Sequence, residues 1–476
     1  MRFAPNTRGS LATPALALLL VLGGLISLAA AGADPPEASQ ARPAGRLDQP
    51  RGHDGCIHRK AINRCASGRF VTSPEDVVVS PDGRFVYVAS FGNHAIAIFA
   101  RNRRTGHLRQ LPGRRGCVHH QPADPRPGAC VRARALGGPA ALAMSPAGAN
   151  LYVVAAGSDA LSVFARNRRT GALRQLSGGA GCFSQREGGG CTLVRAMNEP
   201  TSVAVSPNGR RVYVAGRRFP SAIAIFTRAD DGSLTQAAGT AGCISHAGGS
   251  DCAVARGLAS PEEVAVTPDS RHVIVAGSRS NAVAVLHAGA DGLSQADGAA
   301  GCIARGGGSE GCGVGRALAG PVDLAISPDG RFVYVASSIA DAVAILRRDR
   351  ATGVLTQSLT RRGCISQSGG GGLCTVGRGL DEVWGIDVSP DGRNLYAVSS
   401  KVNMLSAMAR DQVTGRLAQL PGRFACFIRA GGLGCPEGRG LTVAVAVDVS
   451  PDGRNVYVAS EDTYLGSVAI FRRLVR

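Results

Sequence analysis

Seven arginines recur at one fixed place in the chain, eleven residues before a Ser-Pro or Thr-Pro pair. They are Arg69, Arg134, Arg195, Arg256, Arg316, Arg378 and Arg439. A guanidinium group can hold a carboxylate, sulfate or phosphate through two parallel hydrogen bonds, so such a ring could bind an anionic ligand. A catalytic site is asymmetric, however. A residue present in every repeat is therefore better explained as one that fastens each loop to its neighbour, and this second interpretation is favoured.

Acidic residues lie four or two positions before the same Ser/Thr-Pro pairs. They are Asp76, Glu263, Asp323, Asp387 and Asp448. Positions two apart on a strand share a face, so we expect these carboxyls to point into one channel. Three uses are open: ion pairs with the recurring arginines, a cation site of converging carboxylates, and general acid–base catalysis. The last is considered because nearby like charges raise carboxyl pKa values, but ion pairing is favoured.

Residues that stand in only one repeat are the remaining candidates for ligand contact. His119 and His120 lie in the longest Cys-to-Cys segment, and Arg217 and Arg218 lie in a predicted loop between strands. Trp384 is the only tryptophan and precedes a predicted strand. Histidines in a loop are commonly solvated and a single tryptophan commonly packs in a core, so ligand contact is one of two alternatives for each.

The elements that position these residues are set by an internal repeat. The Ser/Thr-Pro pairs begin at Ser80, Ser145, Ser206, Thr267, Ser327, Ser389 and Ser450. The stretch Ser80–Ser90 recurs letter for letter at Ser327–Ser337. Each repeat contains an apolar strand, a tight turn that is usually Asp-Gly or Asn-Gly, and three further strands. Seven repeats of four antiparallel strands predict an all-β fold, the seven-bladed β-propeller.

The first and last repeats are complementary. The last repeat stops after its third strand, whereas Ala44–Cys56 matches the fourth strand and continuation of the first repeat, Thr105–Cys117. We therefore expect an N-terminal strand to complete the last blade, with Arg46–Gln49 paired to Val468–Phe471. Such closure removes the exposed edge that an open array would leave.

These repeats resemble those of the lactonase-type seven-bladed propellers and the related YVTN surface-protein repeats. The resemblance rests on "SPDGRFVYVAS", a third strand that ends in Arg, and a following "TGxLxQL", and it spans roughly residues 44–476. It implies a propeller fold and a family that includes 6-phosphogluconolactonase-like and carboxymuconate-cyclising enzymes. The active-site His, Glu and Arg set of those enzymes matches no positions here, so no catalytic residue is transferred.

Fourteen cysteines form one pair in each connection between repeats. The pairs are Cys56/Cys65, Cys117/Cys130, Cys182/Cys191, Cys243/Cys252, Cys302/Cys312, Cys364/Cys374 and Cys426/Cys435. Their even number and constant phase predict seven local disulfides, each stabilising the fold by about 2–3 kcal/mol. We expect long unstructured connections that crown the channel mouth on one face. Without Cys-x-x-Cys, a metal site is not expected, and neither is a cofactor.

The N-terminus reads as a secretory signal over residues 1–33, followed by a linker over residues 34–43 and the propeller over residues 44–476. An uncleaved membrane anchor is the alternative for the first segment. The formal net charge is +19, and all basic residues except Lys60 and Lys401 are arginine. Few aromatic residues argue against nucleic-acid binding. We expect an extracellular, periplasmic or wall-associated monomer without membrane attachment after signal cleavage.

The favoured function is that of a secreted binding or scaffold module. Its expected partner is a cell-wall or extracellular polysaccharide, another polyanion, or a small anionic ligand, recognised through the stapled face. The alternative, implied by the resemblance, is a lactonase-type hydrolase that acts on a sugar lactone at the channel mouth.

Overall fold

The computed structural model describes residues 44–62, 64–120, 129–249, 251–461 and 466–475. The chain divides into two units, Met1–Arg42 and Pro43–Arg476. The expected signal segment and linker lie outside the described residues, and everything below concerns the second unit. Among the described residues, no helix has the length and apolar character needed to span a membrane.

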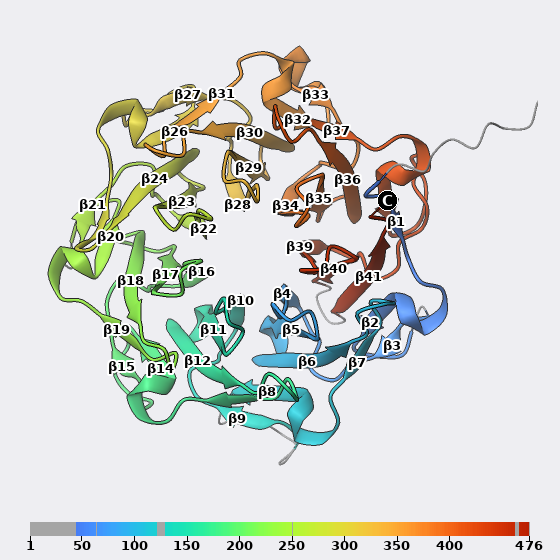
Figure 1. Ribbon diagram of the computed structural model, residues 1–476, viewed down its shortest axis with the longest axis horizontal. Helices are drawn as coiled ribbons and strands as arrows, with labels where there is room; N and C mark the ends of the chain where they lie inside the picture. The colour runs from blue at the N-terminus through green and yellow to red at the C-terminus, as the bar shows by residue number, and fades with distance from the viewer. Residues whose placement is uncertain (1–43, 63, 121–128, 250, 462–465, 476) are drawn as a thin grey trace, which may run out of the picture. The chain divides into compact units, whose positions relative to one another are not determined.

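Seven sheets surround a central axis, as predicted, and form a β-propeller (Figure 1). The inner strands of blades one to seven are β4 (Pro74–Val79), β10 (Pro139–Met144), β16 (Pro200–Val205), β22 (Pro261–Val266), β28 (Pro321–Ile326), β34 (Val383–Val388) and β39 (Ala444–Val449). The second strands are β5 (Phe85–Ser90), β11 (Asn150–Ala155), β17 (Arg211–Gly216), β23 (His272–Gly277), β29 (Phe332–Ser337), β35 (Asn394–Ser399) and β40 (Asn455–Ser460). The third strands are β6 (Ala95–Arg101), β12 (Ala160–Arg166), β18 (Ala222–Arg228), β24 (Ala282–Gly289), β30 (Ala342–Arg348), β36 (Met404–Arg410) and β41 (Ser467–Arg473).

The fourth strand of every blade is split into two pieces that both pair with the third strand. The first pieces are β7 (Leu108–Gln110), β13 (Leu173–Gln175), β19 (Leu234–Gln236), β25 (Gly292–Ser294), β31 (Leu355–Gln357), β37 (Leu417–Gln419) and β1 (Leu47–Asp48). The second pieces are β8 (Cys117–His120), β14 (Cys182–Ser184), β20 (Cys243–Ser245), β26 (Cys302–Arg305), β32 (Cys364–Ser366), β38 (Cys426–Ile428) and β2 (Cys56–His58). One short 3-10 helix separates the pieces in each blade: η3 (Gly113–Gly116), η5 (Gly178–Gly181), η6 (Gly239–Ala241), η7 (Gly298–Ala300), η8 (Arg361–Gly363), η10 (Gly422–Ala425) and η1 (Gly52–Gly55).

A further outer strand runs parallel to the second piece in six blades. These strands are β9 (Val131–Ala133), β15 (Thr192–Leu193), β21 (Ala253–Val254), β27 (Gly313–Gly315), β33 (Thr375–Val376) and β3 (Ala66–Ser67). Three more 3-10 helices, η2 (Phe91–Asn93), η4 (Ala156–Ser158) and η9 (Gly369–Gly372), lie in loops. The expectation of long unstructured connections is therefore wrong. The extra residues lengthen each blade outward and cover its edge, because an uncovered edge strand would leave unpaired backbone groups.

All seven predicted disulfides form, with the predicted pairing. The bridges are Cys56–Cys65, Cys117–Cys130, Cys182–Cys191, Cys243–Cys252, Cys302–Cys312, Cys364–Cys374 and Cys426–Cys435. No cysteine of the described residues is left free.

The position of these disulfides differs from the prediction. The first cysteine of each pair opens the second piece of a fourth strand. In six blades the second cysteine immediately precedes the parallel outer strand; these residues are Cys65, Cys130, Cys191, Cys252, Cys312 and Cys374. Each of these bridges therefore joins the two outermost strands of its blade, which Figure 1 shows at the circumference. The crown expected at the channel mouth is corrected to a belt around the rim, because the residues between repeats form strands that extend the blades outward.

The N-terminal segment closes the ring, with a register that differs from the prediction. Leu47 and Asp48 pair with Arg473 and Arg472, at the end of β41. The part of β41 that was assigned to them, around Val468 and Ala469, instead pairs with β2 through Ile57 and Cys56. The shift follows from the split fourth strand, since β1 needs only the last residues of β41 and leaves the rest to the Cys-containing piece.

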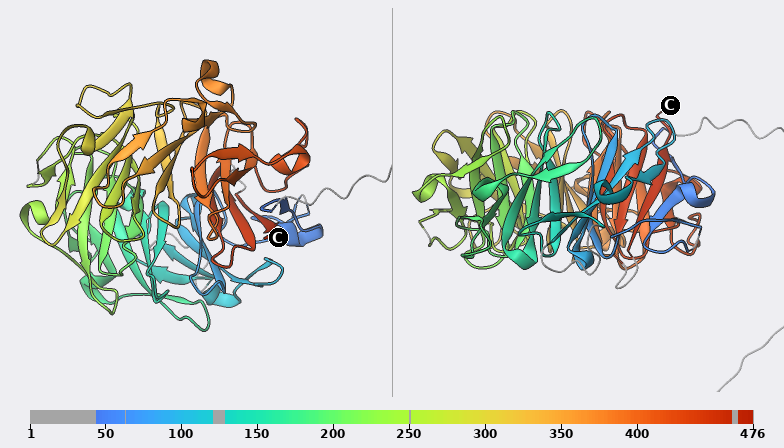
Figure 2. Two further views of the ribbon diagram at one scale, coloured as in Figure 1. Left: turned by 45° about the horizontal axis from the view of Figure 1, so that its top comes forward. Right: turned by 90° about the horizontal axis from the view of Figure 1, so that it is seen from below.

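Two loop faces bound the propeller, which Figure 2 shows edge-on in its right-hand view. One face, here called the turn face, holds the turns from inner to second strands and the loops from third to fourth strands. The other, here called the mouth face, holds the loops from second to third strands and the entries into the next blade. The antiparallel registers require this separation, because Pro74 at the start of β4 pairs with Ser90 at the end of β5.

Neighbouring blades are fastened on the turn face by the arginine that ends the third strand. Arg166 of blade two donates from Nε to the Tyr87 hydroxyl (2.8 Å) and from Nη2 to the Asp82 carboxylate (2.8 Å), both in blade one. Its side chain is wholly buried. The Asp82 side chain also accepts the Ser80 hydroxyl (2.6 Å). The recurring stretch Ser80–Ser90 therefore contains the acceptor of its neighbour's arginine.

Replacing Arg166 with methionine tests this fastening. The change leaves the Tyr87 hydroxyl without its donor and the Asp82 carboxylate without its counter-charge, so we expect the free energy of unfolding to fall by about 3 kcal/mol. Denaturant titration with the disulfides intact measures it. Arg169→Met, at an exposed arginine of the next loop, is the matched control and should shift stability by less than about 0.5 kcal/mol. Equal effects of the two changes would contradict the assignment.

Candidate functional site

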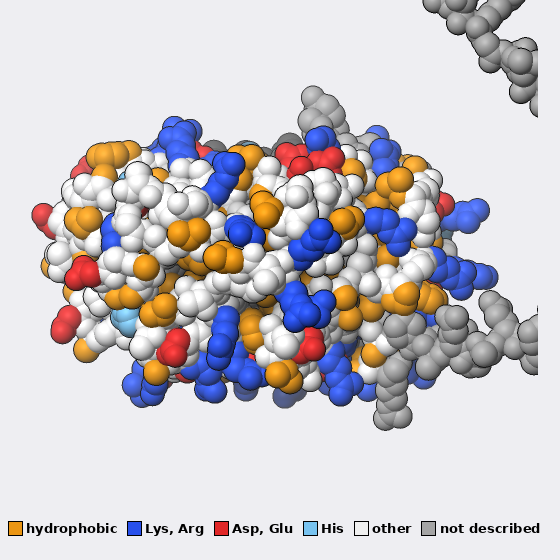
Figure 3. Space-filling view, turned by 90° about the horizontal axis from the view of Figure 1, so that it is seen from above, with side chains coloured by type: hydrophobic (Ala, Val, Ile, Leu, Met, Phe, Trp, Pro, Cys, Tyr) orange, Lys and Arg blue, Asp and Glu red, His pale blue; other side chains and the backbone are white. Residues whose placement is uncertain are grey.

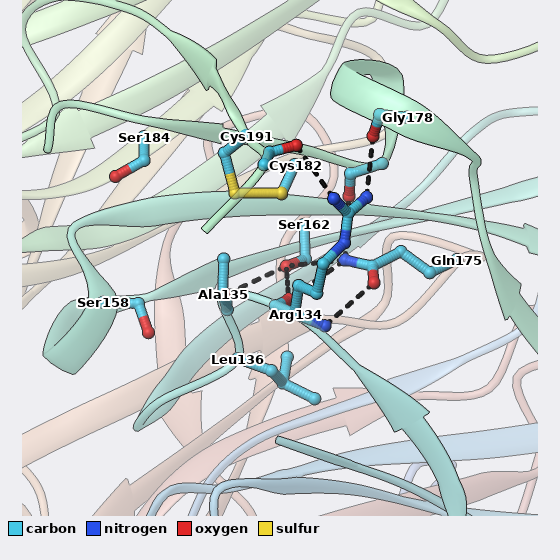
Figure 4. The surroundings of a disulfide bond; sticks show 12 residues. Arg134, Ala135, Leu136, Ser158, Ser162, Gln175, Gly178, Cys182, Ser184 and Cys191 are labelled. Atoms are coloured by element: carbon cyan, nitrogen blue, oxygen red, sulfur yellow. Dashed lines mark hydrogen bonds between the residues drawn. A yellow bond between two sulfur atoms is a disulfide. The ribbon is translucent and has the colours of Figure 1, made fainter. Parts of the chain in front are cut away.

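The seven recurring arginines bind backbone carbonyls of the rim. Arg134 donates to Gly178 O (2.7 Å), in η5 before Cys182, and to Gly190 O (2.8 Å), in the residue before Cys191, so it binds next to the Cys182–Cys191 bridge of blade two (Figure 4). Corresponding bonds to carbonyls of the next blade's rim are made by Arg69, Arg195, Arg256, Arg316, Arg378 and Arg439. These contacts agree with the fastening interpretation. A ligand-binding role for these arginines stays a prediction.

A glutamine missed in the sequence analysis completes each of these junctions. Gln175 Oε1 accepts the Arg134 N–H (2.9 Å), and Gln175 Nε2 donates to Arg134 O (3.0 Å) and Gly181 O (2.9 Å). A Cβ on Gly181 would lie 2.1 Å from the Leu176 carbonyl oxygen, which explains the glycine before this cysteine. The available signal was a Gln, in "RQL" or "TQ", that recurs a few residues before a Gly-Cys pair.

The channel carboxyls are brought together, but they are held by backbone N–H groups. Asp76 accepts from Val77 N (2.7 Å) in its own strand and from Leu142 N (2.8 Å) in the next inner strand. Asp323 makes the same pair of bonds to Leu324 N and Ile386 N. Among the described residues these carboxyls form no ion pair with the recurring arginines, so the favoured use in the sequence analysis is wrong. The carboxylates of Asp76 and Asp323 instead each connect one inner strand to the next.

Two further carboxylates make the same kind of contact between inner strands, at a position closer to the turn face. Asp387 accepts from Val388 N and from Val449 N of blade seven, and Asp448 accepts from Val79 N (2.8 Å) of blade one. In blade three Ser202 stands at the position that Asp76 and Asp323 occupy in their blades, and its Oγ accepts Val264 N (3.2 Å). A hydroxyl can thus replace a carboxylate here without loss of the strand contact, which means that the acidic character of the channel exceeds what the fold requires.

Burial and mutual repulsion raise the pKa values of these carboxyls. Burial raises the pKa of Asp76 to about 7, and that of Asp387 to about 7 with a further contribution from Asp323. The pKa of Asp323 is raised to about 7 by burial, against two backbone hydrogen bonds that lower it. Burial and acidic neighbours raise the pKa values of Glu263 and Asp448 well above their usual range. The pKa values of Asp76, Asp323 and Asp387 therefore lie near neutral pH.

A β-bulge in every inner strand displaces one residue beside the mouth face. In blade one the register jumps from Pro74 to Asp76 and leaves Glu75 unpaired, and in blade six it leaves Trp384 unpaired. Bulges commonly re-aim side chains next to functional sites. Burial, with repulsion from Glu461 and Asp76, raises the pKa of Glu75 to about 7. Trp384 is 39% exposed, so it does not pack fully in the core.

The other singular residues of the mouth face are engaged with acids and with each other. Arg217 and Arg218 both bind the Glu199 carboxylate, and Arg217 also lies 3.6 Å from Glu262. These contacts hold the second-to-third-strand loop of blade three against the inner strands. The ligand-binding predictions for both arginines and for Trp384 stay predictions, because none of these contacts involves a ligand.

The paired histidines occupy different environments. His119 is buried and packs edge-on against Phe70, with 5.3 Å between ring centroids. His120 Nδ1 accepts the Leu136 N–H (3.2 Å), and its ring lies 6.4 Å from that of His94. Burial and the neighbouring His94 and His119 lower the pKa of His120. In the described part of the chain, neither they nor any other set of three His, Cys, Asp or Glu residues is arranged to hold a metal ion.

A large cavity that the sequence did not reveal lies where blades six and seven meet. Its volume is about 1110 Å³. Polar and charged lining residues are Asp48, Gln49, Arg51, His58, Arg64, Arg429, Glu437, Arg439, Thr442 and Ser467. Arg439 is committed to the carbonyls of Pro50, Gly52 and Arg64. Among the described residues no carboxylate lies within ion-pair distance of Arg51, Arg64 or Arg429. The lining holds four arginines against the carboxylates of Asp48 and Glu437, so its formal charge is positive.

Blade six, which lines one side of the cavity, departs from the repeat. It has no parallel outer strand among its described residues, whereas the other blades do. After β38 its chain makes only isolated bridges, Ile428 to Glu437 and Gly432 to Cys435. Residues 436–438 still run along β38, because Ile428 N donates to Pro436 O (3.1 Å) and Gly438 N donates to Ile428 O (2.7 Å), so a shorter segment takes the place of the outer strand. Asymmetry of this kind is what a specific site needs and what the repeated fasteners lack.

Together these features define a seven-bladed β-propeller with a disulfide belt, an acidic channel and a basic cavity. A scan against protein-family models found no match, and neither did a search of curated proteins. Among solved structures, hydrazine synthase of Kuenenia stuttgartiensis is 17% identical, with 87% of this chain and 99% of that chain covered at a TM-score of 0.51. The periplasmic gluconolactonase PpgL of Pseudomonas aeruginosa is 17% identical, with 80% and 92% covered at a TM-score of 0.46. At these identities the likeness concerns the fold alone.

The raised carboxyl pKa values predict an unusual dependence of stability on pH. A carboxyl whose pKa is higher in the folded state binds its proton more tightly there, so the free energy of unfolding should fall as pH rises from about 4 to about 7. Asp323→Asn should remove about one proton from the proton release that accompanies unfolding in this window. Denaturant titrations at several pH values measure the slope.

The control for this experiment is Asp411→Asn. Hydrogen bonds from Thr414 and Val413 lower the pKa of the exposed Asp411 carboxyl. Its loss should therefore leave the slope above pH 4 unchanged. An unchanged slope in Asp323→Asn as well would show that the channel carboxyls titrate normally.

Proposed function

We propose that the protein is an exported binding protein whose cavity between blades six and seven takes a small acidic saccharide. The observation that carries the proposal is the cavity of about 1110 Å³ with three guanidinium groups, of Arg51, Arg64 and Arg429, that lack carboxylate partners among the described residues. Ligand pockets typically measure about 300–1,000 Å³, so this one has room for a short oligosaccharide. Export is supported by the seven disulfides, which are typical of oxidising compartments.

The chemistry of the lining favours a sugar that carries carboxylate, sulfate or phosphate groups. Guanidinium groups bind such anions through charge-assisted hydrogen bonds. The cavity also offers the Thr442 and Ser467 hydroxyls and the Asp48 and Glu437 carboxylates, which suit sugar hydroxyls. Phe427 adds an apolar wall. The disulfide through Cys65 and the fastener Arg439 hold the walls in place, and preorganised walls reduce the entropic cost of binding.

Isothermal titration calorimetry with trigalacturonate tests the proposal, with the neutral trisaccharide maltotriose as the ligand control. We expect binding of the acidic sugar alone. The double change Arg51→Gln and Arg429→Gln should weaken it at least about 10-fold, since charged hydrogen bonds contribute about 1.5–3 kcal/mol each. Arg115→Gln, at an exposed arginine of η3 outside the cavity, should have no effect. Equal binding by all variants, or no binding by the unmodified protein, would refute the proposal.

A lactone hydrolase is the second candidate, favoured by the channel carboxyls whose pKa values lie near 7. A general acid or base works best with a pKa near the operating pH. The pKa values of Asp76, Asp323 and Asp387 are raised to about 7. Against this candidate, both oxygens of each of these carboxylates already accept backbone N–H groups.

The hydrolase is tested by assaying sugar and muconate lactones over pH 5–9. Turnover that rises with pH around 7 and is lost in Asp323→Asn would support it. The Arg51 and Arg429 double variant is the control, because changes in the cavity should leave channel chemistry intact. If no lactone is hydrolysed faster than in buffer, the binding proposal stands alone.

A further inference from the structure

The turn face carries exposed arginines in three neighbouring blades, and two arginine pairs among them, Arg103–Arg104 and Arg168–Arg169, have no counterpart in the other blades. Six of these arginines are Arg84, Arg103, Arg104, Arg168, Arg169 and Arg454, from blades one, two and seven. Figure 3 shows the opposite side of the ring edge-on, where Lys and Arg side chains also gather along the lower edge. We call these six residues the basic sector. Among the described residues, none of them lies within ion-pair distance of a carboxylate.

The basic sector is continuous from blade to blade. The guanidinium of Arg84 in blade one reaches the Arg168 and Arg169 carbonyls of blade two at 3.5 and 3.4 Å. On the other side, Tyr457 of blade seven donates to Gly106 O (2.8 Å) in the loop that holds Arg103 and Arg104. The turn of blade seven, which carries Arg454, therefore abuts the loop of blade one, and the turn of blade one abuts the loop of blade two.

The acids of these turns do not compensate the charge. Asp82 is bound by the buried Arg166, and Asp452 by the buried Arg101 (2.8 Å). Each of these pairs is neutral by itself. The six exposed guanidinium groups therefore remain as an excess of positive charge, and neighbouring like charges destabilise a compact state.

Other blades show that the loop conformation does not require arginine. In blade one, Asn102 Oδ1 accepts the N–H groups of Arg104 (3.0 Å) and Thr105 (3.1 Å) and so fixes the loop. In blade six, Asp411 makes the same two bonds, and the positions that correspond to Arg103 and Arg104 are Gln412 and Val413. In blade three the two positions are Asp230 and Asp231, which reverse the charge.

We propose that the basic sector binds a long polyanionic polysaccharide chain across blades seven, one and two. Each exposed guanidinium can hold a sulfate or carboxylate group, and a row that crosses three blades suits a linear polymer. Insertion into a membrane is disfavoured, because none of the exposed large hydrophobic side chains lies in these turns and loops. The absence of exposed aromatic rings from the same described segments disfavours single-stranded nucleic acid, which stacks on such rings.

The experiment measures binding of dextran sulfate to the full-length protein as a function of salt, with uncharged dextran as the ligand control. The sector variant combines Arg103→Gln, Arg104→Ala, Arg168→Gln and Arg169→Ala. The matched charge control combines Arg271→Gln, Arg347→Gln, Arg350→Gln and Arg393→Gln. These are four exposed arginines in blades four, five and six. Each variant loses four positive charges, so a difference in binding between the two variants cannot come from net charge alone.

We expect dextran sulfate to bind tightly at low salt and dextran not at all. The sector variant should bind at least about 10-fold more weakly, and its slope of log affinity against log salt should be smaller by about 3, at about 0.7 per lost charge. The control should stay within about twofold of the unmodified protein. Circular dichroism and the thermal midpoint confirm that both variants fold.

Two outcomes would overturn the inference. Equal weakening in both variants would show that binding follows the net charge of the protein and does not depend on the basic sector. Binding to phosphatidylglycerol vesicles without binding to dextran sulfate would identify a membrane as the partner. Binding of trigalacturonate in the cavity should be unchanged in the sector variant, so failure here and failure of the proposed function are distinguishable.

Discussion

The buried guanidinium at the end of the third strand is the contact on which the propeller depends. A blade is a small twisted sheet that cannot bury both of its faces alone, so it must be held in one orientation against its neighbours. Arg101, Arg166 and Arg473 do this with the same partners, a tyrosine hydroxyl and the aspartate of the preceding blade's turn. Hydrogen bonds to buried charges are strong when every donor is satisfied, and here the second strand, the turn and the neighbouring blade all supply acceptors.

Departures from this contact show how the fold tolerates variation. In blade five Arg348 binds Asp269 (3.0 Å) and the His272 ring, because Ile274 stands where other blades have tyrosine. Blade four ends its third strand with Ala288 and Gly289 in place of the arginine. One junction can lack the guanidinium because six others, the closed ring and the disulfide belt restrict the blades on both sides.

The sequence predicted the fold in detail because its signals are local and repeated. Asp-Gly turns, strands of alternating type and paired cysteines occur in every repeat, so errors in one are corrected by the others. The register of ring closure was missed because a split fourth strand has no distinctive residue pattern, only a Gly before the cysteine. The cavity could not be predicted, since it lies between two blades and Cys426–Cys435, beside it, has the same spacing as other pairs. The ion pairs expected for Asp76 failed because backbone N–H groups lay closer than any arginine.

The distribution of arginine separates structure from recognition. Arginines at repeated positions are buried or bonded to carbonyls, as Arg166 and Arg134 are, and they account for blade fastening. Arginines at positions where other blades carry Asp, Gln or Ala, such as Arg103 and Arg168, gather on one sector of the turn face. The fold fixes the first group and accepts other residue types at the positions of the second, although Arg168 also donates to Ala147 O (3.4 Å). This difference is the reason for proposing a partner outside the chain for the second group, and the same reasoning applies to Arg51 and Arg429 in the cavity, which are not among the seven recurring arginines.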